Sequence, residues 1–459
     1  MVGYGIFLGC GLLLMGICLY ARKKGNRDDT NSMIRGDGSV GGFTLTFSVL
    51  AAWMWTTSIF GASETYALYG IWGPISYVAG ACIAFAGLIA FLAFLRRRFA
   101  RSITWLGFLQ VRYGRRTKLF YYIFAIIAPG YVLIEQAVGI GYLLESFYGS
   151  SFRVLSFLSV LIGAGFVFFG GMKAVLEEER ITASIILAAF AAGAIFVLTK
   201  GDAAPVSAAQ IPAPAEGLGE LAVTALRYFI MAIVIAFGQI VFDPAYYIKA
   251  NLAADTKTMG SSYILGGIVL WGGITLISSL YLGRAAFAAG TDVAALFGGV
   301  AKVIFSIVII FIGISTIAHF MIGFLGVFSL DLYEEASGID GSDRDRMIFG
   351  RILIAATAVF CASMAIALED ISLLTIDIFC AIFFAAPCVP LVMGCFTQRN
   401  FGKLPMIASL LGIIGGLTVW LAAPGSVLQN QFVGLAASLL ISLLIMLGGF
   451  VNRLPYDRG

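Results

Sequence analysis

The sequence has little charge for its length. Asp, Glu, Lys and Arg make up 12% of its 459 residues, roughly half of the share that is usual in soluble proteins. Hydrophobic residues make up 60%, and the mean hydropathy is +0.97. This balance excludes a soluble globular protein and fits only a protein of the lipid bilayer.

Histidine is almost absent, and cysteine is not arranged for chemistry. With His319 as the single histidine and no long soluble stretch, the chain lacks the nucleophile and neighbouring base of an enzyme. The net charge of +4 does not indicate a nucleic-acid partner, because Lys and Arg mainly set orientation in membrane proteins. The seven cysteines lie in apolar surroundings without paired loop spacing, which argues against a disulfide framework or a metal site. They are Cys10, Cys18, Cys82, Cys361, Cys380, Cys388 and Cys395.

Long hydrophobic runs predict an all-α integral membrane protein of the cell membrane. The first run lacks a basic leader and is followed at once by Arg22, so it is expected to be a retained anchor and not a cleaved signal peptide. About 19 residues suffice to cross a bilayer, and thirteen such spans are predicted. They are 3–21, 41–69, 72–95, 118–147, 153–171, 180–199, 222–250, 261–283, 295–330, 349–367, 371–396, 404–423 and 431–451.

Basic residues are concentrated in alternate loops. Of the 29 Lys and Arg, the opposite loops and nearby helix ends hold Arg153, Lys200, Arg227, Arg284 and Lys302. The positive-inside rule then places the N-terminus outside and the C-terminus in the cytoplasm, in agreement with an odd number of spans. The loops assigned to the cytoplasm are 22–35, 96–101, 112–118, 173–180, 249–257, 344–351, 399–403 and 453–458.

Two of the spans are interrupted near their middle by polar and helix-loosening residues, at 51–58 (AAWMWTTS) and 237–244 (FGQIVFDP). Backbone that leaves the helix inside a bilayer is tolerated where protein or a water-filled cavity satisfies it, so a matched pair of broken spans predicts a solute site at mid-membrane. Each break opens a block of five spans. Because five is odd, the second block starts from the opposite face, which predicts an inverted repeat.

The chain divides accordingly into four parts. Residues 1–34 form an additional span and a basic cytoplasmic loop, 35–221 the first repeat with an extracellular loop, 222–396 the second repeat, and 397–459 two further spans and a short cytoplasmic tail. The longest connections, 201–219 and 334–345, have too little apolar content for a separate domain.

Several strings resemble the sodium:solute symporter family, whose core is the LeuT-like arrangement of five plus five helices. The strings at 51–56, 66–70 and 72–74 (AAWMWT, YALYG, WGP) and at 237–247 (FGQIVFDPAYY) are similar to the urea-transporter branch. The strings at 170–175 (GGMKAV) and 329–333 (SLDLY) match the family more generally. The resemblance extends over about residues 35–400.

The resemblance implies a sodium site. The family builds it from carbonyls of the broken first core helix and from oxygens of the eighth, which correspond here to Ala51 and Met54 and to Ile312, Ser315 and Thr316. Na⁺ is a hard cation that prefers oxygen ligands, and an unwound helix frees carbonyls to face the two hydroxyls. Without the resemblance, the two hydroxyls would be expected to bond to carbonyls of their own helix.

Some members have a second sodium site, with an acidic residue at the start of the fifth core helix and further hydroxyls on the eighth. The acidic position is Glu179 here, but the hydroxyl positions are Ala318 and His319. One hypothesis is that Glu179 and His319 bind a proton in place of a cation, because imidazole titrates near neutral pH. The alternative is a neutral histidine that is hydrogen-bonded inside the bundle.

The solute site is expected between the two broken spans, where aromatic walls and a few convergent polar groups suit a small polar molecule such as urea or another amide. Asp243 precedes Pro244, so its carboxylate could equally cap the helix that follows. Glu64 is expected at the outer mouth of the cavity, and the role of Asp377 is left open. The predicted solute-binding residues are Trp53, Trp55, Glu135, Gln239, Asp243, Tyr246 and Tyr247.

The sequence therefore predicts a sodium-coupled symporter of a small polar solute that works by alternating access. A proton-coupled symporter that uses Glu179 and His319 is the first alternative. A passive channel is the second, although no ring of polar residues repeats with the symmetry that a pore needs. The expected partners are the solute, the lipid bilayer and the coupling ion, which is Na⁺ or, in the first alternative, H⁺. The choice between monomer and homodimer stays open.

Overall fold

The computed structural model describes residues 1–24, 30–36, 38–99, 104–200, 218–333, 335, 342–397, 399, 401–425 and 427–451. Most of the predicted extracellular segment 201–219 and of the cytoplasmic tail lies outside these residues. The described chain is almost entirely helical. Its helices are α1 (Val2–Lys24), α2 (Thr30–Arg35), α3 (Gly42–Trp53), α4 (Thr56–Tyr69), α5 (Trp72–Arg98), α6 (Trp105–Tyr113), α7 (Arg115–Tyr148), α8 (Phe152–Lys200), α9 (Leu218–Val241), α10 (Pro244–Leu252), α11 (Thr256–Tyr263), α12 (Trp271–Ala289), α13 (Gly299–Gly326), α15 (Asp343–Ala367), α16 (Leu373–Phe396), α17 (Leu404–Ala422) and α18 (Val427–Val451). π-Helical segments extend α11 (η2, Ile264–Leu270) and α13 (η4, Val327–Leu332), and a 3₁₀ turn (η3, Ala294–Leu296) precedes α13.

Eleven helices of the described chain are long and apolar enough to cross a bilayer, or twelve when α3 and α4 form one bent span. Large apolar side chains such as Leu12, Ile352 and Leu444 are exposed on the outside of the bundle, where lipid can cover them. The protein is therefore a multi-pass membrane protein. The predicted count of thirteen spans is not confirmed. The spans expected at 153–171 and 180–199 both fall within α8, which is kinked at Gly171.

A single glycine interrupts α8. Gly171 has φ 59° and ψ −160°, a conformation that is essentially restricted to glycine. The kink redirects the helix, and residues 173–180, predicted to be a cytoplasmic loop, are helical instead.

Gly171→Ala should lower the melting temperature of the detergent-purified protein. A side chain in this conformation costs about 1–3 kcal/mol, and a Cβ would also lie 2.6 Å from the carbonyl oxygen of Met33. Gly193→Ala is the matched control, because Gly193 lies in the same helix with open space around it. Equal melting temperatures for the two variants would show that the kink does not require glycine at position 171.

Both predicted breaks are present. Met54 and Trp55 are extended residues between α3 and α4, which meet at an angle of 52°. Phe242 and Asp243 separate α9 from α10, and Pro244 occupies the first turn of α10, where its missing N–H costs nothing. The chain thus leaves the helix where polar residues interrupt the hydrophobic runs.

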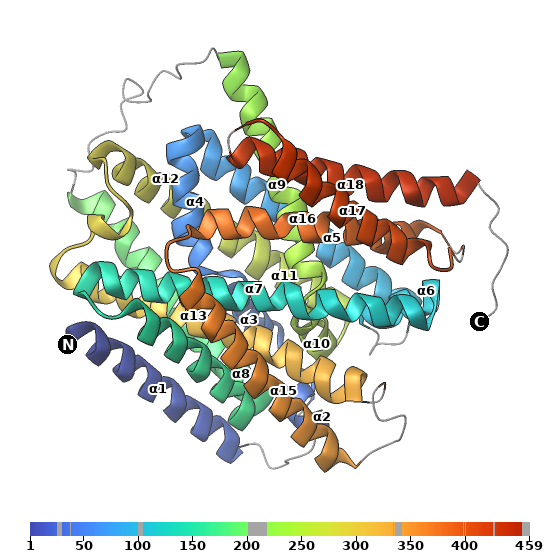
Figure 1. Cartoon of the computed structure of the whole chain (residues 1–459). Coiled ribbons are helices and arrows are strands. Elements are labelled where there is room, and N and C mark those ends of the chain that lie inside the picture. The colour runs from blue at the N-terminus through green and yellow to red at the C-terminus, as the bar shows by residue number, and fades with distance from the viewer. Residues whose placement is uncertain are drawn as a thin grey trace.

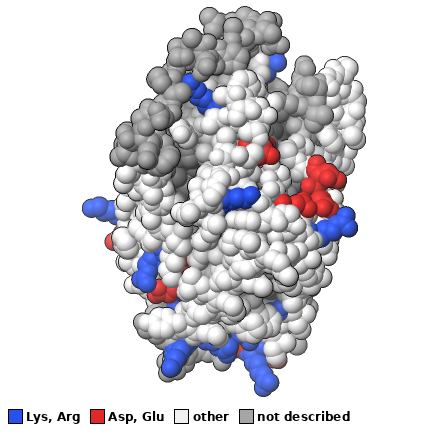
Figure 2. Space-filling model, turned by 90° about the vertical axis from the view of Figure 1, so that its left-hand side faces the viewer, with Lys and Arg blue, Asp and Glu red and all other residues white. Residues whose placement is uncertain are grey.

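The inner arms of the broken spans lie deep in the bundle. Figure 1 shows α3 and α10 near its centre, whereas α1 runs along one edge and α17 and α18 along the opposite edge. Helix α13 packs against α8, α7, α10 and α3, and α8 also packs against α3. The end of the molecule at which α1 begins is formed largely by uncharged residues among those described (Figure 2). The orientation of the termini across the membrane stays a prediction.

Candidate functional site

Side chains from neighbouring helices form hydrogen bonds with the backbone groups that are freed at the break between α3 and α4. The backbone N–H of Thr56 donates to Oε1 of Gln136 at 2.8 Å. The hydroxyl of Thr316 donates to the carbonyl oxygen of Met54 at 3.3 Å. Unpaired backbone groups are costly away from water, so these contacts explain how the unwound segment persists inside the bundle.

The five predicted sodium ligands lie on two neighbouring elements. Ala51 and Met54 are at the end of α3, and Ile312, Ser315 and Thr316 are in α13; all five are buried. The contact between Thr316 and Met54 joins the two groups. Carbonyl and hydroxyl oxygens that face each other suit a hard monovalent cation, so the donor set fits Na⁺, although its occupancy stays a prediction.

A carboxylate that the sequence analysis did not single out lies beside these residues. Glu178 is fully buried, accepts a hydrogen bond from Ser315 at 2.8 Å and accepts another from Thr182 at 2.6 Å. It was placed in the loop predicted at 173–180. A signal was present in the run of three acids at 177–179, because consecutive residues of a helix point in different directions and cannot all share its surface.

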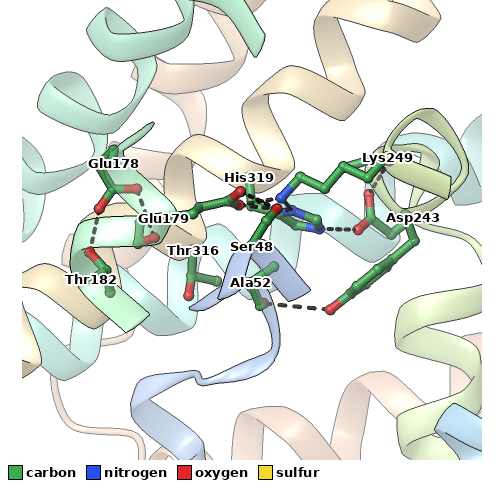
Figure 3. A network of polar contacts seen from close by, with 12 residues as sticks. Ser48, Ala52, Glu178, Glu179, Thr182, Asp243, Lys249, Thr316 and His319 are labelled. Carbon is green, nitrogen blue, oxygen red and sulfur yellow. Dashed lines mark hydrogen bonds and ion pairs between the residues drawn. The ribbon is translucent and has the colours of Figure 1, made fainter. Parts of the chain in front are cut away.

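A second buried network joins both broken spans to α8 and α13. Oε2 of Glu179 accepts from the hydroxyl of Ser48 at 2.5 Å, and Oε1 pairs with the ammonium of Lys249. Nδ1 of His319 lies 2.6 Å from Nζ of Lys249, and Nε2 lies 2.9 Å from Oδ2 of Asp243. Figure 3 shows these side chains converging around Ser48, with Glu178 turned toward Thr182.

The contacts define the tautomer of His319. An ammonium group carries only donors, so Nδ1 accepts from Lys249 and the ring proton is on Nε2, which donates to Asp243. A second ring proton on Nδ1 would point at the Lys249 ammonium and be repelled by it. The predicted pair of Glu179 and His319 is therefore joined through Lys249, with its own closest contact at 3.4 Å.

The position of Lys249 corrects the sequence analysis. It was counted with the basic residues of a cytoplasmic loop at 249–257, but α10 continues to Leu252 and the Lys249 side chain is fully buried. Its charge therefore says nothing about loop orientation. A warning was present in the sequence, because Lys249 lies within the span predicted at 222–250, where ionisable residues commonly have a function.

A small cavity lies between the broken spans. It is lined by Trp53, Trp55 and Gln239 of the predicted solute site, and by Asp377, whose carboxylate accepts a hydrogen bond from Gln239. Its volume of about 20 Å³ gives room for about one water molecule. A urea-sized molecule would need the side chains to move.

The other predicted solute-binding residues do not line this cavity. Asp243 caps α10 by accepting from the N–H of Ala245 at 2.9 Å, as the structural alternative predicts. Tyr247 donates to the carbonyl of Val241 at 2.7 Å, and Tyr246 contacts that of Ala52 at 3.5 Å. Glu135 is fully buried, and neither of its oxygens has a hydrogen-bond partner among the described residues.

A wider cavity of about 690 Å³ lies along the next turns of α4. Its walls include Phe60 and Glu64 of α4. Ser58, which comes two residues before Phe60 in the same helix, lines the small cavity. Tyr142, which also lines the wider cavity, donates to Asp292 at 2.7 Å. Glu64, expected at an outer mouth, thus borders this wider cavity.

Comparisons with curated proteins give two relatives at low identity, and no family model matches the sequence. The chain is 25% identical over 307 residues to the probable urea active transporter 1 of Schizosaccharomyces pombe, and 23% identical over 321 residues to the urea-proton symporter DUR3 of Oryza sativa subsp. japonica. Each alignment covers 62% of this chain, but only 46% and 44% of the relatives. The chain thus spans less than half of their length.

Solved structures share the fold across nearly the whole chain. A Na⁺-coupled sialic acid symporter in a substrate-bound outward-open state matches with a TM-score of 0.69 at 18% identity, covering 97% of both chains. MhsT in complex with L-phenylalanine matches at 0.54 and 13% identity, covering 90% of this chain and 99% of the other. Inward-facing Mhp1 matches at 0.51 and 14% identity, covering 90% and 92%.

These likenesses establish the fold. The predicted LeuT-like arrangement with two broken helices is confirmed, and so is the resemblance to the urea-transporter branch of the sodium:solute symporters. The names of both relatives describe transporters and not enzymes. The division at residues 34, 221 and 396 stays a prediction.

Proposed function

We propose that the protein is a secondary active transporter that couples the movement of Na⁺ to that of a small polar solute by alternating access. The observation that carries the proposal is the contact between the hydroxyl of Thr316 and the freed carbonyl of Met54, beside the buried carboxylate of Glu178. The predicted ligands lie on α3 and α13, which pack against each other, and Ser315 of α13 is hydrogen-bonded to Glu178. Such a set stabilises a bound monovalent cation that is cut off from water.

Ion binding would act on the solute site through the break. Met54 supplies a carbonyl to the ion site, while its neighbours Trp53 and Trp55 line the small cavity. A cation that holds the Met54 carbonyl thereby fixes the two indoles. Because a ligand shifts a conformational equilibrium only by its differential affinity for the two states, the ion would favour the state in which the indoles are placed for the solute.

The cavity favours a small, uncharged solute with several hydrogen-bonding groups. Gln239 and Asp377 offer an amide and a carboxylate, and the indole N–H of Trp53 has no partner among the described residues. Urea carries both carbonyl and amino groups that match these partners. The names of the two relatives make urea the first solute to test.

Proton coupling is the second candidate, and one observation favours it. His319 is fully buried between Asp243 and Lys249, and the name of the rice relative describes a proton symporter. Imidazole is the side chain whose charge changes most readily near neutral pH. In this version, the network of Glu179 and His319 binds the coupling proton, and Lys249 has to leave Nδ1 of His319 to make room for it.

The melting temperature of the detergent-purified protein tests both versions. It should be higher in Na⁺ than in choline buffer, and higher again when urea is added to Na⁺, because a ligand that binds only the folded state stabilises it by about 2.7 kcal/mol at a hundred times its dissociation constant. The control is urea in choline buffer, which should give little or no rise. No Na⁺ effect, together with a response to solute that depends on pH, would overturn sodium coupling in favour of the proton version.

A further inference from the structure

We propose that Lys249 supplies the cation of a second ion site from within the chain, so that the protein couples transport to only one external cation. The cation position is defined by the carboxylate of Glu179, the hydroxyl of Ser48 and the imidazole of His319. The occupied position is a property of the fold. Only its consequence for coupling rests on the proposed function.

The geometry of this position is that of a cation site. Its members come from α3, α8, α10 and α13, which are the inner arms of both broken spans and the two helices between them. Every side chain in it is fully buried. An external cation at this place would bridge the broken spans to the bundle, and the Lys249 ammonium makes the same bridge (Figure 3).

The ligands favour an ammonium over Na⁺. One of the groups around the cation is a ring nitrogen, Nδ1 of His319, and not an oxygen. An ammonium can donate a hydrogen bond to such a nitrogen, whereas Na⁺ prefers oxygen and would lose one ligand there. Ala318, the residue before His319, has no hydroxyl to replace it.

Four helices contribute the ionisable and polar groups around Lys249. Helix α8 contributes Glu178 and Glu179, α10 contributes Asp243 at its first turn, α13 contributes His319, and α3 contributes only the neutral Ser48. Glu179 is neutralised by Lys249, and Asp243 by the helix N-terminus and the ring proton. Glu178 remains beside Ser315, where the proposed external cation would bind. Of the two adjacent acids of α8, Glu179 therefore binds the tethered cation of Lys249, and Glu178 lies where the exchangeable external cation would bind.

A cation tethered in this way cannot be released with the solute. Lys249 is on α10, six residues after the break at Asp243, so its ammonium stays covalently attached to this helix and cannot cross the membrane with the solute. The site would then hold the inner arm of the second broken span against α8 without consuming an ion gradient.

Deletion of the Lys249 side chain tests the cation position. Lys249→Ala removes the atoms of a propylammonium ion, so propylammonium chloride should raise the melting temperature of K249A well above its value in choline chloride, because choline has no N–H to donate. The variant is purified with propylammonium present from the first step. A protein that is recovered folded only under this condition supports the position as well.

Two variants serve as controls. Lys118→Ala removes an ammonium whose partner, Glu335, keeps a second ion pair with Arg115, so propylammonium should not change the melting temperature of this variant beyond the effect on wild type. The double variant K249A/E179Q lacks the carboxylate that binds the cation, so its melting temperature should not respond either. A response of all three variants, or of none, would overturn the cation position.

The sodium dependence of the wild type tests the coupling consequence. With one external cation, Na⁺-stimulated uptake should have a Hill coefficient near 1, because this coefficient can rise as far as the number of sites. A value near 2 would show that Lys249 does not replace a second ion, even if K249A binds propylammonium. If wild type shows no Na⁺ response but K249A is rescued, the proposed sodium coupling fails and the tethered cation stands.

Discussion

Glu179→Gln should destabilise the folded protein by about 3–5 kcal/mol, the usual cost of removing one partner from a buried ion pair. The ammonium of Lys249 would remain buried without its countercharge, with His319 and the new amide oxygen as neutral partners. The double variant E179Q/K249M should recover most of this loss, because it leaves no uncompensated charge and replaces the pair by groups of similar volume.

The measurement is thermal unfolding of the single and double variants in one detergent and one buffer. Arg153→Gln provides the control, because its ion pair with Glu369 is largely exposed and such pairs contribute about 0–1 kcal/mol. E179Q should melt far below R153Q, and the double variant should lie close to wild type. If the double variant is no more stable than E179Q, the two side chains do not act as a pair.

Replacing Ser315 and Thr316 together by alanine should abolish the dependence of transport on Na⁺. Both hydroxyls are buried, one on Glu178 and the other on the Met54 carbonyl. Their loss removes two of the proposed oxygen ligands and leaves a buried carboxylate without its donor from α13. Each hydrogen bond to a charged group is worth about 1.5–3 kcal/mol, so an affinity loss of at least tenfold is expected.

Uptake of radiolabelled urea into proteoliposomes, with Na⁺ or choline outside, measures this loss. Ser159→Ala is the matched control, because its hydroxyl is equally buried but bonds a carbonyl of its own helix at 2.8 Å. Wild type and S159A should be stimulated by Na⁺ to the same extent. Equal stimulation of the double variant would refute the assignment of the ion site, provided that it melts within the range of S159A.

Much of the fold could be predicted because the bilayer constrains the sequence directly. Hydrophobic runs identified the spans, and polar residues at 51–58 and 237–244 identified both breaks. The loop predicted at 173–180 was wrong, since the helix that follows the kink at Gly171 continues through Glu177, Glu178 and Glu179, a stretch with the local composition of a loop. Hydropathy averages over a window, so it cannot distinguish a charged loop from a helix whose charges are paired inside the protein.

The sequence by itself determined the class of protein, the positions of the two breaks and the residues around them, because these depend on local composition and on the cost of unpaired backbone in lipid. Only the tertiary structure decided which ionisable groups meet. Lys249, Glu179 and His319 are separated by about 70 residues each, and the charge of a buried group can be judged only once its partners are known. For this reason the sequence placed Lys249 in a loop, whereas the fold makes it the centre of a buried network between the two broken helices.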